Sequence, residues 1–159
     1  MADSVFNIAK GKVAEYMARV DGNDPTASAI VMVLLKSAGL ETHAVLKDRD
    51  DLSAILAAAN DECDFTNYAR RVMTDTDVAV TAVDDAGDDQ EAAVSNWVIA
   101  NAGGALNNTI GMLLICYDAD TAAGTDSNIV PLTMHDLTVT TDGTQLTISP
   151  SAVSFFRAA

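Results

Sequence analysis

The second half of the chain is almost without positive charge. No Lys or Arg occurs in residues 72–156, a stretch that holds 12 of the 23 Asp and Glu residues of a chain with a formal net charge of −14. Nucleic acids and anionic lipids need clustered Lys and Arg for counterion release or surface attraction. The sequence therefore predicts that this half binds neither nucleic acid nor a membrane surface.

Aromatic residues and cysteines are also scarce. Aromatic residues make up 5% of the 159 residues, so we expect a core of Val, Leu, Ile and Ala. The two cysteines, Cys63 and Cys116, are too few for a disulfide framework, or for a zinc site with its usual set of about four ligands. We expect Cys116 to be a small core residue and the two thiols to stay unbridged, because cytoplasmic cysteines are kept reduced.

Targeting segments are not apparent in the sequence. Residues 1–10 lack the basic region and apolar stretch of a secretory signal. The longest apolar run, residues 29–35, has the length of a strand and falls short of the roughly 18 residues that cross a bilayer. We expect a product that is made and kept in a cytoplasm and has no membrane partner.

The most apolar segment with turn residues on both sides is residues 109–118, TIGMLLICYD. Asn107-Asn108 precedes it and Asp118-Ala-Asp120 follows it, so its length fits a strand better than a helix. A short run that is apolar on both faces is typical of a central strand in a packed sheet. We expect the other strands to be arranged around this one.

Further strands are predicted where β-branched residues cluster or apolar and polar residues alternate. We expect them at residues 29–35, 42–46, 68–73, 78–83, 92–99 and 130–133. The last should lie at an edge, because Pro131 cannot donate to a ladder. Residues 137–140 and 145–148 flank Asp142-Gly143, which predicts a hairpin.

Helical spacing occurs only in the N-terminal third. It predicts a short amphipathic helix within residues 5–20 and a second helix at residues 50–59, which begins with acidic residues. Many short strands with one or two short helices predict an α+β, mainly β fold, a β-sandwich or jelly-roll-like domain. We expect a single domain of residues 1–159, with an N-terminal segment at 1–27 and a β-rich body at 28–159.

Few residue groups suggest catalysis. His135-Asp136 is a pair that metal phosphohydrolases use, but the only other histidine is His43, so a structural histidine is favoured. Neither a nucleophile elbow nor a phosphate-binding glycine pattern is present. Arg70-Arg71 is the only adjacent basic pair, and a simple edge charge is favoured for it. We expect no enzyme and no cofactor.

Two acidic loops invite a cation hypothesis. Asp118, Asp120 and Asp126 could supply hard oxygen ligands around Gly124, and residues 84–89 hold four further aspartates. Neither stretch matches the calcium loop with its alternating ligands, central Gly and terminal Glu. A solvated turn is therefore favoured in both places, with a bound cation as the alternative.

A series of short motifs occurs in order along residues 68–157. They are Tyr68-Ala-Arg, Asp84-Asp85, Trp97, the apolar strand ending in Tyr117-Asp118, Val130-Pro-Leu-Thr, His135-Asp136-Leu137, Asp142-Gly143 and Phe155-Phe156-Arg157. In this order they resemble small virion structural proteins of tailed bacteriophages, and the resemblance extends loosely to residues 6–35. It implies a non-enzymatic particle component, most often a capsid decoration (cement) protein. A tail or fibre component is the alternative.

The resemblance implies where the protein acts. A decoration protein is assembled in the host cytoplasm and binds the major capsid protein on the outer surface of the virion. We expect a homotrimer, since closed cyclic symmetry is the usual solution for such a chain. The acidic residues 72–156 should face solvent, and the basic residues Lys10, Lys12 and Arg19 should contact an acidic partner surface. A carbohydrate-binding module is a further alternative, although Trp97 and three tyrosines supply few aromatics for sugar stacking.

Overall fold

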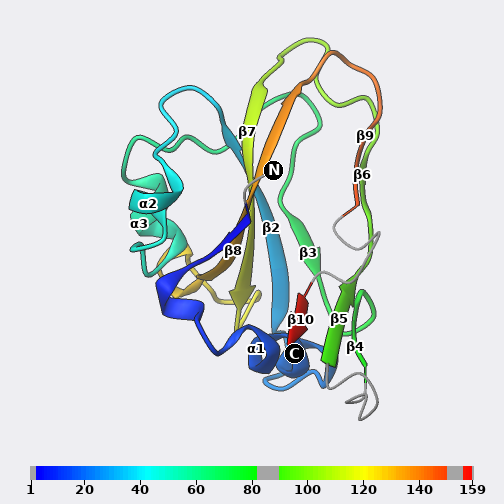
Figure 1. Ribbon diagram of the computed structural model, residues 1–159. Helices are drawn as coiled ribbons and strands as arrows, with labels where there is room; N and C mark the ends of the chain where they lie inside the picture. Colours follow the sequence, from blue (N-terminus) through cyan, green and yellow to red (C-terminus); the bar gives the residue numbers. More distant parts are fainter. Residues whose placement is uncertain (1–2, 82–89, 150–155, 159) are drawn as a thin grey trace.

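The computed structural model shows a chain dominated by antiparallel strands, with a few short helices (Figure 1). The structure describes residues 3–81, 90–149 and 156–158. Within these residues the strands form sheets of five, three and two strands. The α+β, mainly β fold class is thereby confirmed, while the jelly-roll connectivity stays a prediction.

The largest sheet has the strand order β1-β8-β7-β2-β3. Its strands are β1 (Asp3–Val5), β2 (Ala29–Lys36), β3 (Arg71–Met73), β7 (Thr109–Asp118) and β8 (Val130–Thr140). The middle strand, β7, is buried over most of its length and pairs with β2 on one side and β8 on the other. The central strand predicted at residues 109–118 is therefore confirmed with these bounds.

β2 is the second strongly apolar strand, and its first seven residues are buried. It runs antiparallel to β7 from Ala29, opposite Asp118, to Lys36, opposite Ile110. On its other side β3 covers only three residues, and the rest of that edge is closed by the loop before β3. There the Cys63 N–H donates to the Leu34 carbonyl at 2.8 Å. The strand predicted at 29–35 is confirmed, whereas the one predicted at 68–73 begins only at Arg71.

β8 is longer and lies further inside the sheet than the sequence predicts. It spans 11 residues, so the short segment predicted at 130–133 is wrong in length, but residues 130–132 lie before the part of β8 that pairs with β1 and have a strand partner only in β7. Pro131 lies opposite Cys116, where the register of β7 and β8 shifts. β1 pairs with β8 only from Thr133 to His135. A residue without an N–H is tolerated at such an irregularity.

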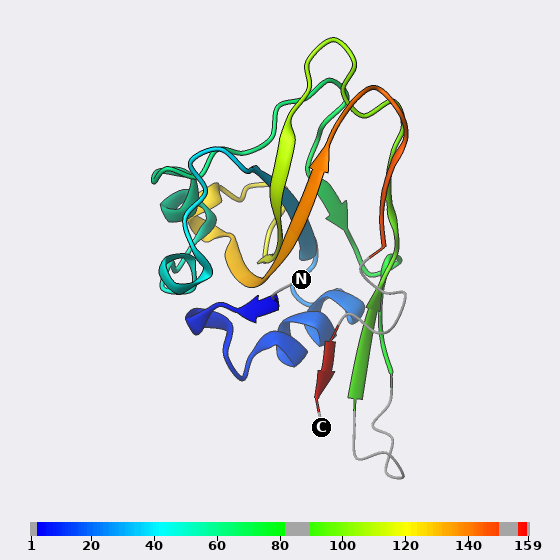
Figure 2. The same ribbon diagram turned by 45° about the horizontal axis from the view of Figure 1, so that its top comes forward.

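Most strands of the two small sheets, β4, β5, β6 and β9, lie to the right of the main sheet in both views (Figures 1 and 2). One contains β4 (Val78–Val80), β5 (Gln90–Val94) and β10 (Phe156–Ala158), and the other pairs β6 (Trp97–Ile99) with β9 (Leu146–Ile148). The single strand predicted at 92–99 is thus two strands in different sheets. Of the strand predicted at 78–83, residues 82–83 lie outside the described residues.

Side-chain hydrogen bonds hold the break between β5 and β6. The Ser95 hydroxyl donates to Asp77 Oδ1 at 2.7 Å and accepts from Arg71 Nη2 at 3.1 Å. These partners lie 18 and 24 residues away in the sequence. A local alternation of apolar residues carries no information about such distant bonds, so it predicts one continuous strand.

The turn at Asp142-Gly143 does not join two paired strands. β9 pairs with β6 and not with β8, so the predicted hairpin is wrong. Gly143 instead donates to the Ala102 carbonyl at 2.8 Å, and the Ala102 N–H donates to the Thr144 carbonyl at 2.8 Å. The turn is therefore docked onto the loop that leads into β7.

The α-helices are short, and each contains at least one buried apolar residue. α2 (His43–Leu46) replaces the strand predicted at 42–46, because the Thr42 carbonyl accepts the N–H groups of both Val45 and Leu46 at 3.0 Å and Leu46 is buried. The helix predicted at 50–59 is confirmed as the shorter α3 (Leu52–Leu56). Asp51 caps it by accepting the Ala54 N–H at 2.7 Å.

The N-terminal segment packs onto the strands. After β1 come a 3-10 helix, η1 (Asn7–Ala9), and α1 (Val13–Asp21), whose buried residues follow the predicted amphipathic spacing. Figure 2 shows α1 below the main sheet and beside β10. Phe6, Met17 and Val20 belong to the same apolar cluster as β2 and β7. A second 3-10 helix, η2 (Asp126–Asn128), precedes β8. None of the helices in the described part of the chain has the length and apolar character needed to cross a membrane.

Candidate functional site

The basic residues that the sequence singles out lie on one segment but in different environments. Lys10 directly follows η1, Lys12 directly precedes α1, and both are exposed. Neither lysine forms an ion pair with any described residue. Arg19, in the last turn of α1, is also exposed but is paired. The structure therefore separates the lysines from the arginine.

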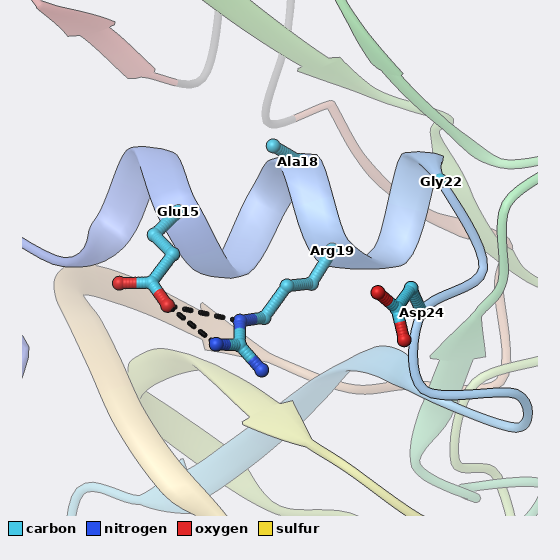
Figure 3. A pocket seen from close by; sticks show the side chains of 5 residues that line it. All are labelled: Glu15, Ala18, Arg19, Gly22 and Asp24. Atoms are coloured by element: carbon cyan, nitrogen blue, oxygen red, sulfur yellow. Dashed lines mark hydrogen bonds and ion pairs between the residues drawn. The ribbon is translucent and has the colours of Figure 1, made fainter.

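Arg19 is already bound to its own helix. Its Nε and Nη2 donate to Glu15 Oε1 at 3.0 and 2.6 Å, and these hydrogen bonds raise the pKa of Arg19. Figure 3 shows the guanidinium turned toward Glu15 in an open hollow whose far side is formed by Asp24. A guanidinium that is already paired with Glu15 attracts an acidic partner less than a free lysine does. Arg19 is thus the weakest of the three predicted contacts.

A third free cation, which the sequence did not single out, lies close to η1. Of the eight Lys and Arg side chains that the structure describes, five form ion pairs with carboxylates. The three without such a pair are Lys10, Lys12 and Lys47. Lys47 follows α2, and its carbonyl accepts the Asn7 N–H at 2.8 Å. All free positive charge in the described side chains therefore gathers around η1.

Exposed apolar residues accompany these lysines. Val5 of β1 and Ile8 of η1 are each 37% exposed, and Val45 of α2 is 46% exposed. We call the set of these three residues with Lys10, Lys12 and Lys47 the N-terminal surface. Its mixture of exposed aliphatic side chains and free positive charge is typical of a protein contact with a hydrophobic centre and a charged rim.

The N-terminal surface is held in place by contacts between distant parts of the chain. Phe6 is fully buried, and its N–H donates to the Leu132 carbonyl at 3.0 Å. Besides its backbone bond to residue 47, Asn7 donates from its side chain to Asp48 Oδ1. β1 and η1 are thus fixed against both β8 and α2, so the surface is preorganised.

A serine, a histidine and an aspartate are linked beside this surface. Ser4 Oγ lies 2.9 Å from His43 Nδ1, and His43 Nε2 lies 2.8 Å from Asp136 Oδ1. His43, which the sequence shows only as the second histidine, thus connects β1, α2 and β8 through its ring. The second member of the sequence pair, His135, contacts Thr133 through Nε2 at 2.9 Å. His135 and Asp136 thus have different partners.

The contact order of Ser4, His43 and Asp136 is also that of a hydrolytic triad. A nucleophile of that type requires, in addition, donors aimed at the developing oxyanion and a place for the substrate. The described contacts of these three residues instead hold an edge strand to the sheet. We therefore name the group the N-terminal clamp and assign it a positioning role.

The acidic loop after β7 uses its carboxylates internally. Asp118 Oδ1 accepts the Asp120 N–H at 3.0 Å, and Asp120 Oδ1 accepts the Ala122 N–H at 3.0 Å. Asp126 binds Arg70 at 2.5 Å. Among the described residues no group of three or more His, Cys, Asp or Glu side chains could hold a metal ion. The second loop considered for a cation, residues 84–89, lies outside the described residues.

The two cysteines are buried and unbridged. Burial raises the pKa of the Cys63 thiol and of the Cys116 thiol to about 12. At neutral pH both are therefore protonated, and a protonated thiol is a poor nucleophile. The core role expected for Cys116 is confirmed.

Comparisons with known proteins do not assign the chain to a family. No protein family, no curated protein and no solved structure matches the chain. The functional argument therefore rests on the residues themselves.

The N-terminal clamp can be tested by removing its histidine. We expect His43→Ala to lower the free energy of unfolding by about 1–2 kcal/mol, because two hydrogen bonds are lost and Asp136 keeps one partner fewer. Ser4→Ala should have about half this effect. Urea unfolding measures the change, and hydrogen exchange should show that the β1 amides lose protection first.

A matched control is available on the neighbouring helix. Ser53 of α3 is exposed and uses only its backbone in a described hydrogen bond, so Ser53→Ala should change stability by less than about 0.5 kcal/mol. Unchanged protection of the β1 amides in His43→Ala would show that the clamp does not hold this strand.

Proposed function

We propose that the chain is a non-enzymatic structural protein of a tailed bacteriophage particle, a capsid decoration protein that binds the outer head shell and stabilises it. The order of motifs in residues 68–157 supports the particle assignment. The observation that carries the binding role is the N-terminal surface, where the three unpaired lysines gather beside exposed aliphatic residues. The partner is the major capsid protein, and the protein acts on the outer surface of the virion as a homotrimer.

The aromatic side chains argue against the carbohydrate-binding alternative. Trp97 is 6% exposed and packs 6.1 Å from Tyr68, measured between ring centroids. Tyr117 is 4% exposed and stacks on Tyr16 at 4.4 Å. Sugar-binding modules present aromatic faces to solvent, whereas these rings are used in packing. A tail or fibre component remains the alternative within the same class of particle proteins.

Charge reversal tests the binding surface on the particle. We expect Lys10→Glu together with Lys12→Glu to weaken binding to heads stripped of the protein by about tenfold or more, because attraction to an acidic partner turns into repulsion. Co-sedimentation of the purified protein with the heads measures the change. Raising the salt concentration should reduce the difference, because the Debye length is about 8 Å at physiological ionic strength and shorter above it.

The acidic stretch at residues 84–89 supplies the matched control. Reversing the aspartates of residues 84–89 should leave head binding nearly unchanged, since this half of the chain is proposed to face solvent. If the loop variant is released from heads and the lysine variant is not, the orientation is wrong. Electron microscopy of the parent particle tests the location, and density for this chain confined to the tail would favour the tail or fibre alternative.

A further inference from the structure

A lysine, an aspartate and an asparagine from three separate segments meet at one end of β2. Lys36 is the last residue of β2, Asp64 lies in the loop before β3, and Asn108 directly precedes β7. Lys36 Nζ lies 3.0 Å from Asp64 Oδ1, and Asn108 Nδ2 donates to the same oxygen at 3.0 Å. One carboxylate oxygen is thus shared by a primary amine and a primary amide.

The backbone holds the lysine and the asparagine close to each other, because β2 and β7 are paired neighbours. The Ser37 N–H donates to the Thr109 carbonyl at 2.9 Å, and these two residues directly follow Lys36 and Asn108. The Lys36 N–H is itself bound by the Asp61 carbonyl at 2.8 Å. The lysine amine is therefore within side-chain reach of the asparagine amide.

The amide oxygen of Asn108 is held by two backbone donors. The N–H groups of Asp64 and Phe65 donate to Asn108 Oδ1 at 2.8 and 3.0 Å. Paired N–H donors of this kind stabilise the negative charge that an amide oxygen gains when a nucleophile adds to its carbon. The cluster thus combines an amine, a carboxylate and oxyanion donors, the groups that acyl transfer to a lysine requires.

The charge and the exposure of Asp64 suit a proton acceptor. Hydrogen bonds from Lys36 and Asn108 lower the pKa of Asp64, so at neutral pH it is a carboxylate. Its side chain is 60% exposed, whereas that of Lys36 is 25% exposed. The carboxylate therefore exchanges protons with solvent, and a small leaving group has a way out. A lysine must lose a proton before it reacts, so the reaction should be slow at neutral pH.

We propose that the folded chain joins Lys36 to Asn108 by an isopeptide bond. Asp64 accepts a proton from the Lys36 ammonium, and the resulting amine adds to Cγ of Asn108. The N–H groups of Asp64 and Phe65 stabilise the charge on Oδ1. Asp64 returns the proton to Nδ2, the Cγ–Nδ2 bond breaks, ammonia leaves, and Nζ gives its second proton to the carboxylate. The step consumes no oxidant or reductant.

The inference goes beyond the proposed function, because the bond forms within one copy in the absence of any particle. It would link two neighbouring strands of the main sheet covalently. Because folding brings the three side chains together, the reaction is effectively intramolecular, and its rate gains from the fixed positions of the reacting groups. A chain that forms the bond but does not bind heads would contradict the proposed function alone.

Intact mass spectrometry under denaturing conditions tests the bond. The folded unsubstituted chain should lose the mass of one ammonia on incubation, faster at pH 9 than at pH 7, because the unprotonated amine is consumed. The chain kept unfolded in urea should keep its full mass, because folding assembles the cluster. Tryptic digestion should give one product that contains both Lys36 and Asn108, since trypsin does not cleave after an acylated lysine.

Two substitutions distinguish the bond from a plain ion pair. Lys36→Arg keeps the positive charge beside Asp64 but has no amine, so it should keep its full mass. Asp64→Asn should slow the reaction by about 100-fold or more, the effect of losing a general base. Asp61→Asn is the matched control and should react like the unsubstituted chain, because Asp61 is exposed and uses only its backbone in a described hydrogen bond. Far-ultraviolet circular dichroism establishes that the variants are folded.

Four results would overturn the inference. The first is a folded unsubstituted chain that keeps its full mass at pH 9, as a plain ion pair would. The second is a loss of ammonia after which trypsin still cleaves at Lys36. The third is an Asp64→Asn chain that reacts as fast as Asp61→Asn. The fourth is a loss of one water with Lys36 joined to Asp64, because the carboxyl group and not the amide would then be the acyl donor.

Discussion

Replacing Arg70 by alanine is expected to lower the free energy of unfolding by about 3 kcal/mol. Arg70 joins the loop before β3 to η2, and its side chain is only 27% exposed. Its guanidinium binds two carboxylates at once. Removing it would leave both carboxylates close together without a counterion.

The geometry of the Arg70 contacts explains the size of the expected effect. Nε and Nη2 donate to the two oxygens of Glu62 at 2.9 and 2.6 Å. Nη1 and Nη2 donate to the two oxygens of Asp126 at 2.5 and 3.0 Å. The Tyr68 hydroxyl donates to Glu62 Oε1 at 2.8 Å and accepts the Leu34 N–H of β2 at 3.1 Å. The network therefore connects η2 to the central sheet through charged hydrogen bonds, which are stronger than neutral ones.

The variant Arg70→Lys distinguishes the effect of the positive charge from the effect of the guanidinium geometry. Lysine keeps the positive charge but cannot bind two carboxylates with a planar fork, so it should recover less than half of the lost stability. Arg19→Ala is the exposed control, since Arg19 forms only a pair within its own helix, and its effect should be much smaller. Urea unfolding measures all three variants. An Arg70→Ala chain as stable as the Arg19→Ala chain would show that the network contributes nothing.

The contact between Arg70 and Asp126 also makes the stability of the fold depend on pH. The hydrogen bonds from Arg70 lower the pKa of Asp126 below its ordinary value of 3.8. A carboxyl whose pKa is lower in the folded than in the unfolded state stabilises the fold above the unfolded pKa, and the stabilisation is lost as the pH falls through the folded pKa. Part of the acid destabilisation below about pH 4 should therefore disappear in Arg70→Ala. Unfolding measured at pH 7 and at pH 3 should show a smaller difference for the variant than for the unsubstituted chain.

Sequence patterns predict those features of the fold that depend on residues within a single strand or helix. The apolar runs of β2 and β7 and the buried face of α1 follow from residues within each element, and they are confirmed. The split of residues 92–99 and the missing hairpin at Asp142-Gly143 depend on partners far away in the sequence. Local patterns cannot reveal these partners, so both predictions are wrong.

The residues of the candidate site also fall into those that the sequence predicts and those that depend on distant contacts. Lys10 and Lys12 could be found because the second half of the chain lacks cations. Lys47 could not be found, because its proximity to η1 depends on a backbone bond between residues 7 and 47. The edge charge favoured for Arg70-Arg71 fits Arg71, which begins the edge strand β3, but the carboxylate partners were not predicted: Arg70 binds Glu62 and Asp126, and Arg71 binds Asp77 at 2.7 Å.

A second large loss of stability is expected from Gly103→Ala, which would disturb the loop between β6 and β7. Gly103 has φ +90°, a conformation that costs a residue with a Cβ about 1–2 kcal/mol. A Cβ there would lie 2.2 Å from Asn107 Oδ1 and 2.7 Å from Thr141 Oγ1. Asn107 Oδ1 accepts the Gly104 N–H at 2.7 Å, so moving it away breaks a bond that shapes the loop.

Gly11→Ala is the matched control for this substitution. Gly11 also has a positive φ, +74°, but a Cβ there would meet no atom within 4 Å. Gly11→Ala should therefore lower the free energy of unfolding only by the backbone cost of about 1–2 kcal/mol. Gly103→Ala should lower it by about 3–4 kcal/mol, because overpacking adds about 1–3 kcal/mol. Urea unfolding of both variants gives the difference, which isolates the steric part. Equal losses at the two positions would mean that Asn107 and Thr141 move aside without cost and that the contact between this loop and the turn before β9 is loose.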